Sequence, residues 1–334
     1  MSRSRLPHVY VLSTGGTIAA KPVSPTQTTG YTSFAFDARA LVDAIPGIEE
    51  RVHITAEQIF AMGSCMLGDG ELLRLAARLN EVLARDDVDG AVLTHGTDTM
   101  EETAFFLNLT VRSRKPVVVT GAMRPSTVLS ADGPLNLLNA ILAAADRQSC
   151  GMGVLVCMDD RLLSARDAVK ASTYRTDAFQ CMEGGRLGAV IGSEVYYDYA
   201  PLRPHTAQSR FDVSGLSALP RVEIVYTHTG CGELLLRAAL ESRCRGVVVA
   251  GSGNGSVPPA LRDLYHSWPG EKPVFVRASR VPGGRVGRNG GMPDEQYGSV
   301  ASGAFSPQKA RLLLQLALTQ TSDIAEIRSI FASY

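Results

Sequence analysis

Two threonine-rich segments each follow a short apolar run of the sequence. The first, residues 13–19, reads STGGTIA, and the second, residues 94–102, reads THGTDTMEE. In open α/β sheets ligands bind beyond the carboxyl ends of the strands, so Thr17, Thr97 and Asp98 could face one substrate. A threonine hydroxyl is a weak nucleophile unless a base lies beside it. The pattern therefore favours acyl transfer by a hydroxyl group, with an acid nearby.

Each segment also has a simpler explanation. The double glycine of the first is typical of a tight turn or a phosphate cradle, although the chain has no GxxxxGKS/T pattern and no GxGxxG at this position. In the second segment, Asp98 or Thr99 could cap a helix, with Glu101 or Glu102 completing a capping box. No GxSxG nucleophile elbow occurs.

Three further groups are weaker candidates. The polar loop at residues 121–134 is explained by an ion pair between Arg124 and Asp132. Lys170 stands alone in its segment, and a lone lysine is usually a solvated surface charge. His95 is the only one of the six histidines inside a motif, so it indicates no chemistry by itself.

The spacing of apolar residues predicts the elements that position these segments. Short β-branched runs alternate with helical patterns, which is typical of a parallel sheet with helices on both faces. In the first part of the chain we expect strands at residues 9–12, 90–94, 116–120 and 153–158, and helices at 38–44, 71–85, 100–109 and 136–146. In the last part we expect strands at 222–226, 246–251 and 274–276, and helices at 233–242, 307–319 and 324–331.

A stretch without periodicity separates these two parts. Residues 196–219 contain scattered prolines and serines, and a chain of 334 residues at roughly 150 residues per domain should form about two domains. We therefore predict an N-terminal domain at residues 1–198, a linker at 199–220 and a C-terminal domain at 221–334. The predicted fold class is α/β. The larger N-terminal domain has a mainly parallel sheet flanked by helices, and the smaller C-terminal domain is also α/β.

The charge balance narrows the class of partner. Lysine and arginine total 33, aspartate and glutamate also total 33, and the formal net charge is zero. Proteins that bind nucleic acids or membrane surfaces normally carry a basic excess, so we expect neither partner. No apolar run approaches the ~18 residues that span a bilayer, and the run at residues 9–12 is too short for a signal-peptide core.

The six cysteines form no CxxC pair and have no zinc-ligand spacing. A chain of this length needs no disulfides for its stability. Their mostly apolar neighbours predict buried free thiols in a reducing compartment. We expect a soluble, cytoplasmic protein without a bound metal.

Taken together, the motifs resemble those of the bacterial-type L-asparaginases and glutaminase-asparaginases. The resemblance rests on TGGTIA at residues 14–19, HGTDTMEE at 95–102 and GAMRPS at 121–126, and it continues in order to SPQKARLLLQLALTQT at 306–321. It implies hydrolysis of the side-chain amide of asparagine, often of glutamine too, without a metal or organic cofactor. It also implies a homotetramer, a dimer of intimate dimers, with each site at a dimer interface.

The same resemblance implies a role for each motif residue. Thr17 matches the nucleophile that forms a β-aspartyl ester, and Tyr31 matches the tyrosine of a mobile loop that activates it. Thr97, Asp98 and Lys170 match a second set of hydroxyl, acid and lysine groups.

Further matches imply how the substrate is bound. Ser64 matches the serine that binds the α-carboxylate, and Asp98 would also pair with the α-ammonium group. Asn254 matches the asparagine that the partner subunit brings to the site. Gly16, Cys65 and Ala122 occupy the remaining substrate-binding positions.

Two of the substrate-binding positions depart from the family pattern. Cys65 stands where the family usually has glutamine, and the glutamate expected from the partner chain falls at Gly290 or Gly291. Asp294 or Glu295 could replace that glutamate only along a different loop path. We therefore expect weaker or altered recognition of the α-amino group, with the threonine chemistry retained. In the simpler explanation Cys65 is a small buried residue and water fills the space.

Three alternatives to an asparaginase stay open at this point. One is a related amidase with a different substrate preference. Another is a non-catalytic amino-acid sensor, although a sensor would not require the nucleophile together with the lysine set. The last is a glycine-rich nucleotide-binding protein, which the missing fingerprints disfavour.

Overall fold

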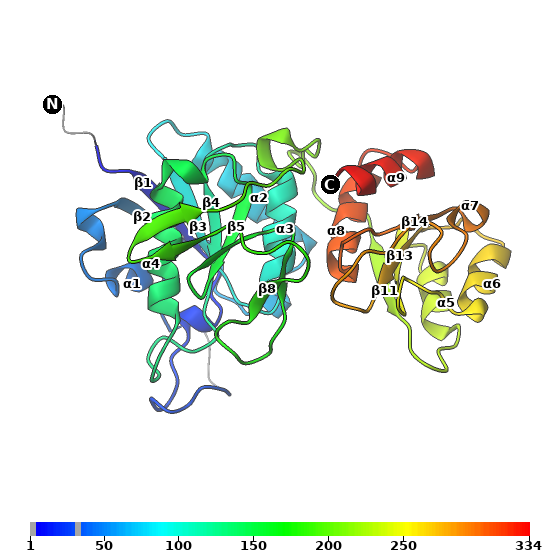
Figure 1. The fold of residues 1–334 in the computed structure, drawn as a ribbon, viewed down its shortest axis with the longest axis horizontal. Helices are drawn as coiled ribbons and strands as arrows, with labels where there is room; N and C mark the ends of the chain where they lie inside the picture. The colour runs from blue at the N-terminus through cyan, green and yellow to red at the C-terminus, as the bar shows by residue number, and fades with distance from the viewer. Residues whose placement is uncertain (1–4, 31–34) are drawn as a thin grey trace. The chain divides into compact units, whose positions relative to one another are not determined.

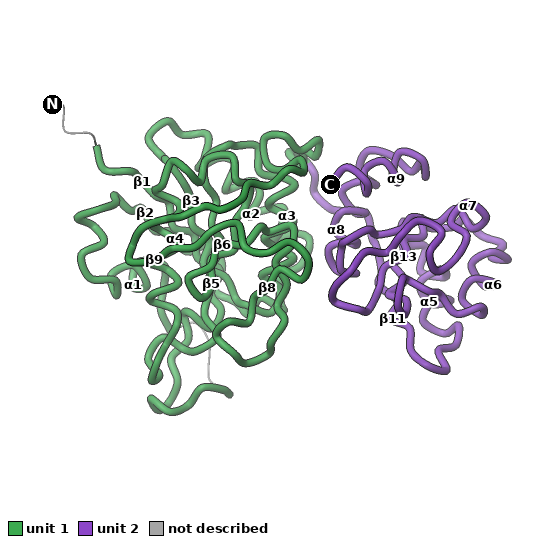
Figure 2. The backbone as a smooth tube through the Cα atoms, in the orientation of Figure 1, with its two compact units in different colours: residues 1–215 green, residues 216–334 purple. Residues whose placement is uncertain are grey.

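The structure is a computed structural model that describes residues 5–30 and 35–334. The chain divides into two compact units, residues 1–215 and 216–334 (Figure 2). None of the helices in the described ranges combines the length and apolar character needed to cross a membrane. Each unit has its own sheet and its own core, as an α/β chain of this length requires.

The first unit is built on an eight-stranded sheet with the strand order β10-β9-β6-β5-β4-β3-β1-β2. Its parallel part comprises β1 (His8–Ser13), β2 (His53–Gln58), β3 (Gly90–Thr94), β4 (Val117–Thr120) and β5 (Val154–Met158). The antiparallel part comprises β6 (Arg161–Ser164), β9 (Gly188–Ile191) and β10 (Glu194–Tyr197). A separate two-stranded ribbon is formed by β7 (Ala168–Lys170) and β8 (Phe179–Cys181).

Helices cover both faces of this sheet (Figure 1). α1 (Ala38–Asp43) and α4 (Gly133–Ala145) pack on one face, and α2 (Asp69–Leu83) and α3 (Met100–Thr110) pack on the other. Every residue of β1 and β3 is buried, as expected for strands covered on both sides. Short 3₁₀ turns complete the unit: η1 (Thr17–Ala19), η2 (Ile48–Glu50), η3 (Ser64–Met66), η4 (Arg147–Ser149) and η5 (Thr206–Gln208).

The second unit contains a parallel sheet of four strands in the order β11-β12-β13-β14. The strands are β11 (Val222–Tyr226), β12 (Gly246–Gly251), β13 (Val274–Ser279) and β14 (Ser299–Ala301). The helices are α5 (Leu234–Glu241), α6 (Pro259–Ser267), α7 (Asp294–Tyr297), α8 (Pro307–Leu318) and α9 (Ile324–Ser333). The predicted α/β class, with a larger and mainly parallel first sheet, is confirmed.

The segment expected to be a linker is more ordered than its composition indicates. Residues 199–215 belong to the first compact unit, where Phe211 is buried and η5 packs against α3. The prolines and serines of this segment gave no periodicity from which its buried residues could be predicted. The bounds of the two predicted domains stay a prediction.

All six cysteines are free, but only two of them are buried as expected, and Cys181 and Cys231 are half-buried. Cys157 and Cys244 are buried, whereas Cys65 and Cys150 are exposed. Cys65 follows Ser64 in the 3₁₀ turn η3, so its thiol is not a core group. The simpler explanation of Cys65 as a buried small residue is therefore also wrong.

Candidate active site

Two glycines let the loops that follow β1 and β3 touch. Gly16 has a φ of +85°, and a Cβ atom on it would lie 2.4 Å from the Cα atom of Gly96. A Cβ atom on Gly96 would lie 2.8 Å from the Oγ atom of Ser64. Only glycine permits such close approach. The segments that carry Thr17, Thr97 and Ser64 therefore converge beyond the carboxyl ends of the parallel strands.

A fourth loop joins the same place. A Cβ atom on Gly121 would lie 2.4 Å from the backbone oxygen of His95. A Cβ atom on Gly133 would lie 3.2 Å from Cβ of Ala122 and 3.0 Å from Cγ1 of Ile18. Ala122 thus lies beside the turn η1, which begins at Thr17.

Thr99 occupies the N-cap position of α3, as one of the two predicted cap residues, but its side chain links two of these loops. Its hydroxyl donates to the backbone oxygen of Ser64 at 2.8 Å, and its side chain makes no capping bond at the start of the helix. The predicted capping box is therefore wrong.

Lys170 is held between two groups of the second threonine motif. Its Nζ atom donates to Oγ1 of Thr97 at 2.9 Å and to Oδ1 of Asp98 at 2.7 Å. The Lys170 side chain is 16% exposed, whereas that of Asp98 is 65% exposed. The interpretation of Lys170 as a solvated surface charge is wrong. An ammonium group bonded to the Thr97 oxygen favours loss of the hydroxyl proton.

The loop around Ala122 is fixed by a carboxylate, but not through the predicted ion pair. Asp132 accepts hydrogen bonds from the backbone N–H groups of Met123 and Arg124, both at 2.9 Å. The Arg124 guanidinium donates to the backbone oxygen of Ser130. Burial raises the pKa of Asp132. Backbone bonds of this kind set the path of the loop more directly than a long arginine side chain does.

His95 is completely buried beneath the loops. Its Nδ1 atom donates to the backbone oxygen of Gly96 at 2.6 Å, since a carbonyl can only accept. Desolvation lowers the pKa of His95 to about 4. The imidazole is therefore neutral near pH 7, and its place in the core fits support of the loop rather than proton transfer.

Comparisons with known proteins decide the family. The model for the N-terminal asparaginase domain matches residues 8–203, and the model for the glutaminase/asparaginase C-terminal domain matches residues 221–331. The chain belongs to the asparaginase family.

Full-length relatives agree with this membership. L-asparaginase 2 of Bacillus subtilis is 44% identical over 332 residues, which cover 98% of this chain and 87% of the relative. The glutaminase-asparaginase of Acinetobacter glutaminasificans is 40% identical, with 98% and 99% covered. The crystal structure of a probable cytoplasmic L-asparaginase from Campylobacter jejuni superimposes with a TM-score of 0.95 at 42% identity, covering 98% of this chain and all of that one.

Not every predicted site residue of this asparaginase-family chain can be placed. The first unit brings together Gly16, Thr97, Asp98, Lys170 and Ser64. Tyr31 lies outside the described residues. Asn254 belongs to the second unit, where its surroundings can be described separately.

In the second unit, glycines 290 and 291 pack directly on the Asn254 loop. The Oδ1 atom of Asn254 accepts from the backbone N–H of Gly287 at 2.8 Å. A Cβ atom on Gly290 would lie 2.2 Å from Nδ2 of Asn254, and one on Gly291 would lie 2.8 Å from the backbone oxygen of Asn254. A side chain at position 291 would therefore meet backbone, and one at position 290 would displace the side chain of Asn254.

Asp294 is not a replacement for the expected glutamate. Its carboxylate accepts two hydrogen bonds from Arg277, at 2.7 and 2.6 Å, and both side chains are fully buried. Arg277 also donates to the backbone oxygen of Asn254, so the pair supports the Asn254 loop. Glu295 is exposed and pairs with Arg288, which leaves Glu295 as the accessible carboxylate of this segment.

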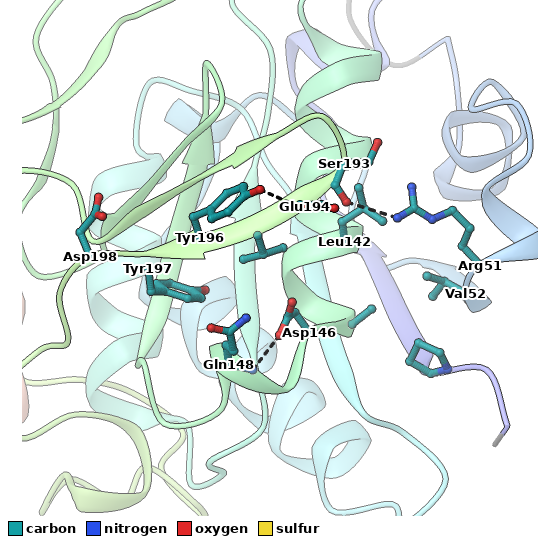
Figure 3. Close-up of a pocket in the computed structure, with 13 residues that line it drawn as sticks. Arg51, Val52, Leu142, Asp146, Gln148, Ser193, Glu194, Tyr196, Tyr197 and Asp198 are labelled. Atoms are coloured by element: carbon teal, nitrogen blue, oxygen red, sulfur yellow. Dashed lines mark hydrogen bonds between the residues drawn. The ribbon is translucent and has the colours of Figure 1, made fainter.

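A cavity of about 640 Å³ beside β10 is a separate feature of the first unit (Figure 3). Arg51 and Val52, which precede β2, help to line it, so it lies at the amino end of that strand. Its polar groups bond to one another: Arg51 donates to the backbone oxygen of Ser193, and Tyr196 donates to Glu194. The threonine motifs do not line this cavity. We therefore place the candidate site at the carboxyl ends of the parallel strands instead. Within the described ranges, no three potential metal ligands cluster.

Proposed function

We propose that this chain hydrolyses L-asparagine to L-aspartate and ammonia, with L-glutamine as a poorer second substrate. The observation that carries the proposal is the contact of Lys170 with Thr97 and Asp98, beside the loop that leads to Thr17. The names of the relatives, L-asparaginase and glutaminase-asparaginase, support the same substrates. No cofactor is needed, because hydroxyl, lysine and carboxylate groups suffice for acyl transfer.

The first half of the proposed reaction uses Thr17 as the nucleophile. Its oxygen attacks the side-chain amide carbon while its proton passes through Tyr31 to the amide nitrogen. The C–N bond breaks and ammonia leaves, so that a β-aspartyl ester forms on Thr17. Backbone N–H groups near Thr97 stabilise the oxyanion that develops.

The second half uses Thr97 and Lys170. A water molecule attacks the ester carbon, and the set of Lys170, Thr97 and Asp98 orients the water and accepts its proton. The ester bond breaks, the proton returns to the oxygen of Thr17, and L-aspartate is released. Thr17 is then ready for another cycle.

We propose that substrate recognition is shared between two subunits. Ser64 binds the α-carboxylate and Asp98 binds the α-ammonium group, with Gly16, Cys65 and Ala122 lining the site. Asn254 of the partner subunit completes it, in a homotetramer assembled as a dimer of intimate dimers. The exposure of Asp98 supports a role toward an incoming ligand.

A second candidate is an amidase with a reduced requirement for the α-amino group. Cys65 is exposed, and a thiol is a poorer hydrogen-bonding group than a carboxamide. Glycine stands at both positions, 290 and 291, where the expected carboxylate would lie. Loss of one charge-assisted contact typically costs about 2–3 kcal/mol, which is enough to change substrate preference.

A coupled assay of ammonia release tests both candidates. We expect turnover of asparagine by the wild type and none by Thr17→Ala. If the wild type binds asparagine without releasing ammonia, the chain is a sensor and the proposal is wrong. Comparing kcat/KM for asparagine, glutamine and the amide that lacks the amino group separates the candidates, because a strong preference for asparagine over the desamino amide excludes the second.

We also propose a cytoplasmic location. The six free thiols are typical of a reducing compartment, and the solved Campylobacter jejuni relative is titled cytoplasmic. Cell fractionation tests this location directly.

A further inference from the structure

Glu101 is a buried carboxylate that the reaction proposed above does not use. It lies in the first turn of α3 and is only 8% exposed. Its Oε2 atom accepts the backbone N–H of Lys170 at 2.6 Å. A carboxylate is expensive to bury without such a partner, so this bond across 69 residues of chain is a specific feature of the fold.

Lys170 needs an anchor of this kind because its strand is weakly supported. β7 has three residues and pairs with β8 in a two-stranded ribbon outside the eight-stranded sheet. A two-stranded ribbon is marginally stable by itself. Lys170 is the last residue of β7, and its long side chain has many rotamers to lose. The ribbon alone would therefore hold the ammonium group loosely.

Residues at the start of α3 bind Lys170 both at its backbone nitrogen and at its side-chain ammonium group. Thr97 and Asp98 immediately precede the helix and bind Nζ, while Glu101 in the first turn binds the backbone nitrogen. The three contacts come from five consecutive residues of one rigid segment. This arrangement fixes the distance from the main chain of Lys170 to the hydroxyl of Thr97.

We propose that Glu101 is a positioning residue, which holds the main chain of Lys170 so that its ammonium group reaches Thr97 and Asp98. The inference deepens the proposed function and rests on it for the kinetic effect. An acidic residue in the first turn of a helix also interacts favourably with the helix N-terminus. Glu102 lies in the same turn and would supply that effect, so the effect does not explain why Glu101 bonds to Lys170.

The test compares Glu101→Leu, Glu101→Gln and the control Glu102→Gln in the full-length protein. Leucine removes the acceptor, whereas glutamine keeps an oxygen that can accept the same bond. For Glu101→Leu we expect kcat for asparagine to fall roughly 10- to 100-fold with KM nearly unchanged, since a displacement of about 1 Å can cost that much. We expect Glu101→Gln to recover most of kcat and Glu102→Gln to behave like the wild type.

A second readout does not depend on activity. The rate at which an amine-specific reagent modifies Lys170, measured by mass spectrometry, should rise several-fold in Glu101→Leu and not in Glu101→Gln. An unchanged rate together with an unchanged kcat would overturn the inference. So would a fall in kcat that glutamine fails to recover, or one that Glu102→Gln reproduces.

Two further outcomes are also informative. If Glu101→Leu does not fold, Glu101→Asp replaces it, because the shorter side chain withdraws the carboxylate from Lys170; wild-type reactivity of Lys170 and wild-type kcat in that variant would contradict the inference. If the wild type releases no ammonia, the proposed function is wrong, while the reactivity of Lys170 still decides whether Glu101 positions it.

Discussion

His95 follows β3 and Lys170 ends β7, and burial affects their side chains differently. The ammonium group of Lys170 donates to two acceptors, Thr97 and Asp98. His95 has no exposed surface, and its Nε2 atom has no hydrogen-bond partner within the described structure. A protonated imidazole there would carry an uncompensated buried charge. The histidine of the motif is therefore a structural group whose protonation should oppose folding.

This difference predicts how stability changes with pH. An unfolded histidine titrates near 6.5, whereas His95 in the folded protein titrates at about 4. Between these values the unfolded chain binds a proton that the folded chain does not, so stability is fully present above pH 6.5 and falls as the pH drops toward 4. From pH 7.5 to 5, His95 should remove about 2 kcal/mol from the free energy of unfolding.

Urea unfolding of the wild type and of His95→Gln at the two pH values measures the effect. The variant lacks the titrating group, so its loss of stability on acidification should be smaller than that of the wild type by the amount above. The other titratable groups, including the remaining histidines, are the same in both proteins and cancel in the difference. Parallel losses in the two proteins would contradict the prediction.

At the scale of elements, the sequence predicts strands best where burial is complete. β1 and β3 are buried throughout and each contains an apolar run, and their positions are confirmed. β2 was not predicted, because HITAEQ is a half-exposed edge strand without an apolar run. The strands from β6 to β10 have three or four residues each, which is too short for a clear periodicity. The strand β14 and the helices α6 and α7 were also not predicted.

The candidate site shows the same limit. The motif loops were predictable from their places after strands, and the contacts of Lys170 with Thr97 and Asp98 fit the expected set. The role of Glu101 was hidden, because locally it has the spacing of a capping residue. Its bond to Lys170 depends on packing between segments far apart in the chain, and one sequence alone does not reveal such pairs.

The contact between the two threonine loops predicts a large effect of one methyl group. In Gly16→Ala the new Cβ atom would meet Gly96 at 2.4 Å, so the loops must separate and Thr17 must move. We expect kcat/KM for asparagine to fall roughly 100-fold or more, because small displacements of reacting groups are costly. Steady-state kinetics with asparagine measures the loss.

Gly47 provides a matched control for the backbone conformation. It also has a positive φ, +72°, but a Cβ atom there would meet nothing within 4 Å. Gly47→Ala should therefore cost about 1–2 kcal/mol of stability for the left-handed conformation and leave kcat/KM unchanged. Equal activity in the two variants would show that the loop contact does not position the nucleophile.

At the scale of the whole molecule, several groups of the second unit fix the loop that carries Asn254. The buried pair of Arg277 and Asp294 supports the backbone at Asn254, and Gly290 packs on its side chain. Contacts that fix both the backbone and the side chain of Asn254 fit a residue that acts outside its own unit. In the proposed assembly its task is to complete the active site of the partner subunit.

Subunit complementation tests this arrangement. Thr17→Ala and Asn254→Ala should each be nearly inactive as separate homo-oligomers. In a mixed intimate dimer, one site would carry both defects, whereas the other would combine an intact Thr17 with Asn254 of the partner subunit. Random pairing of equal amounts makes half of the dimers mixed, so co-expression should restore about a quarter of wild-type ammonia release.

If Asn254 acted within its own chain, every site would keep one defect and co-expression would restore nothing. Full activity of Asn254→Ala alone would instead remove the residue from the site.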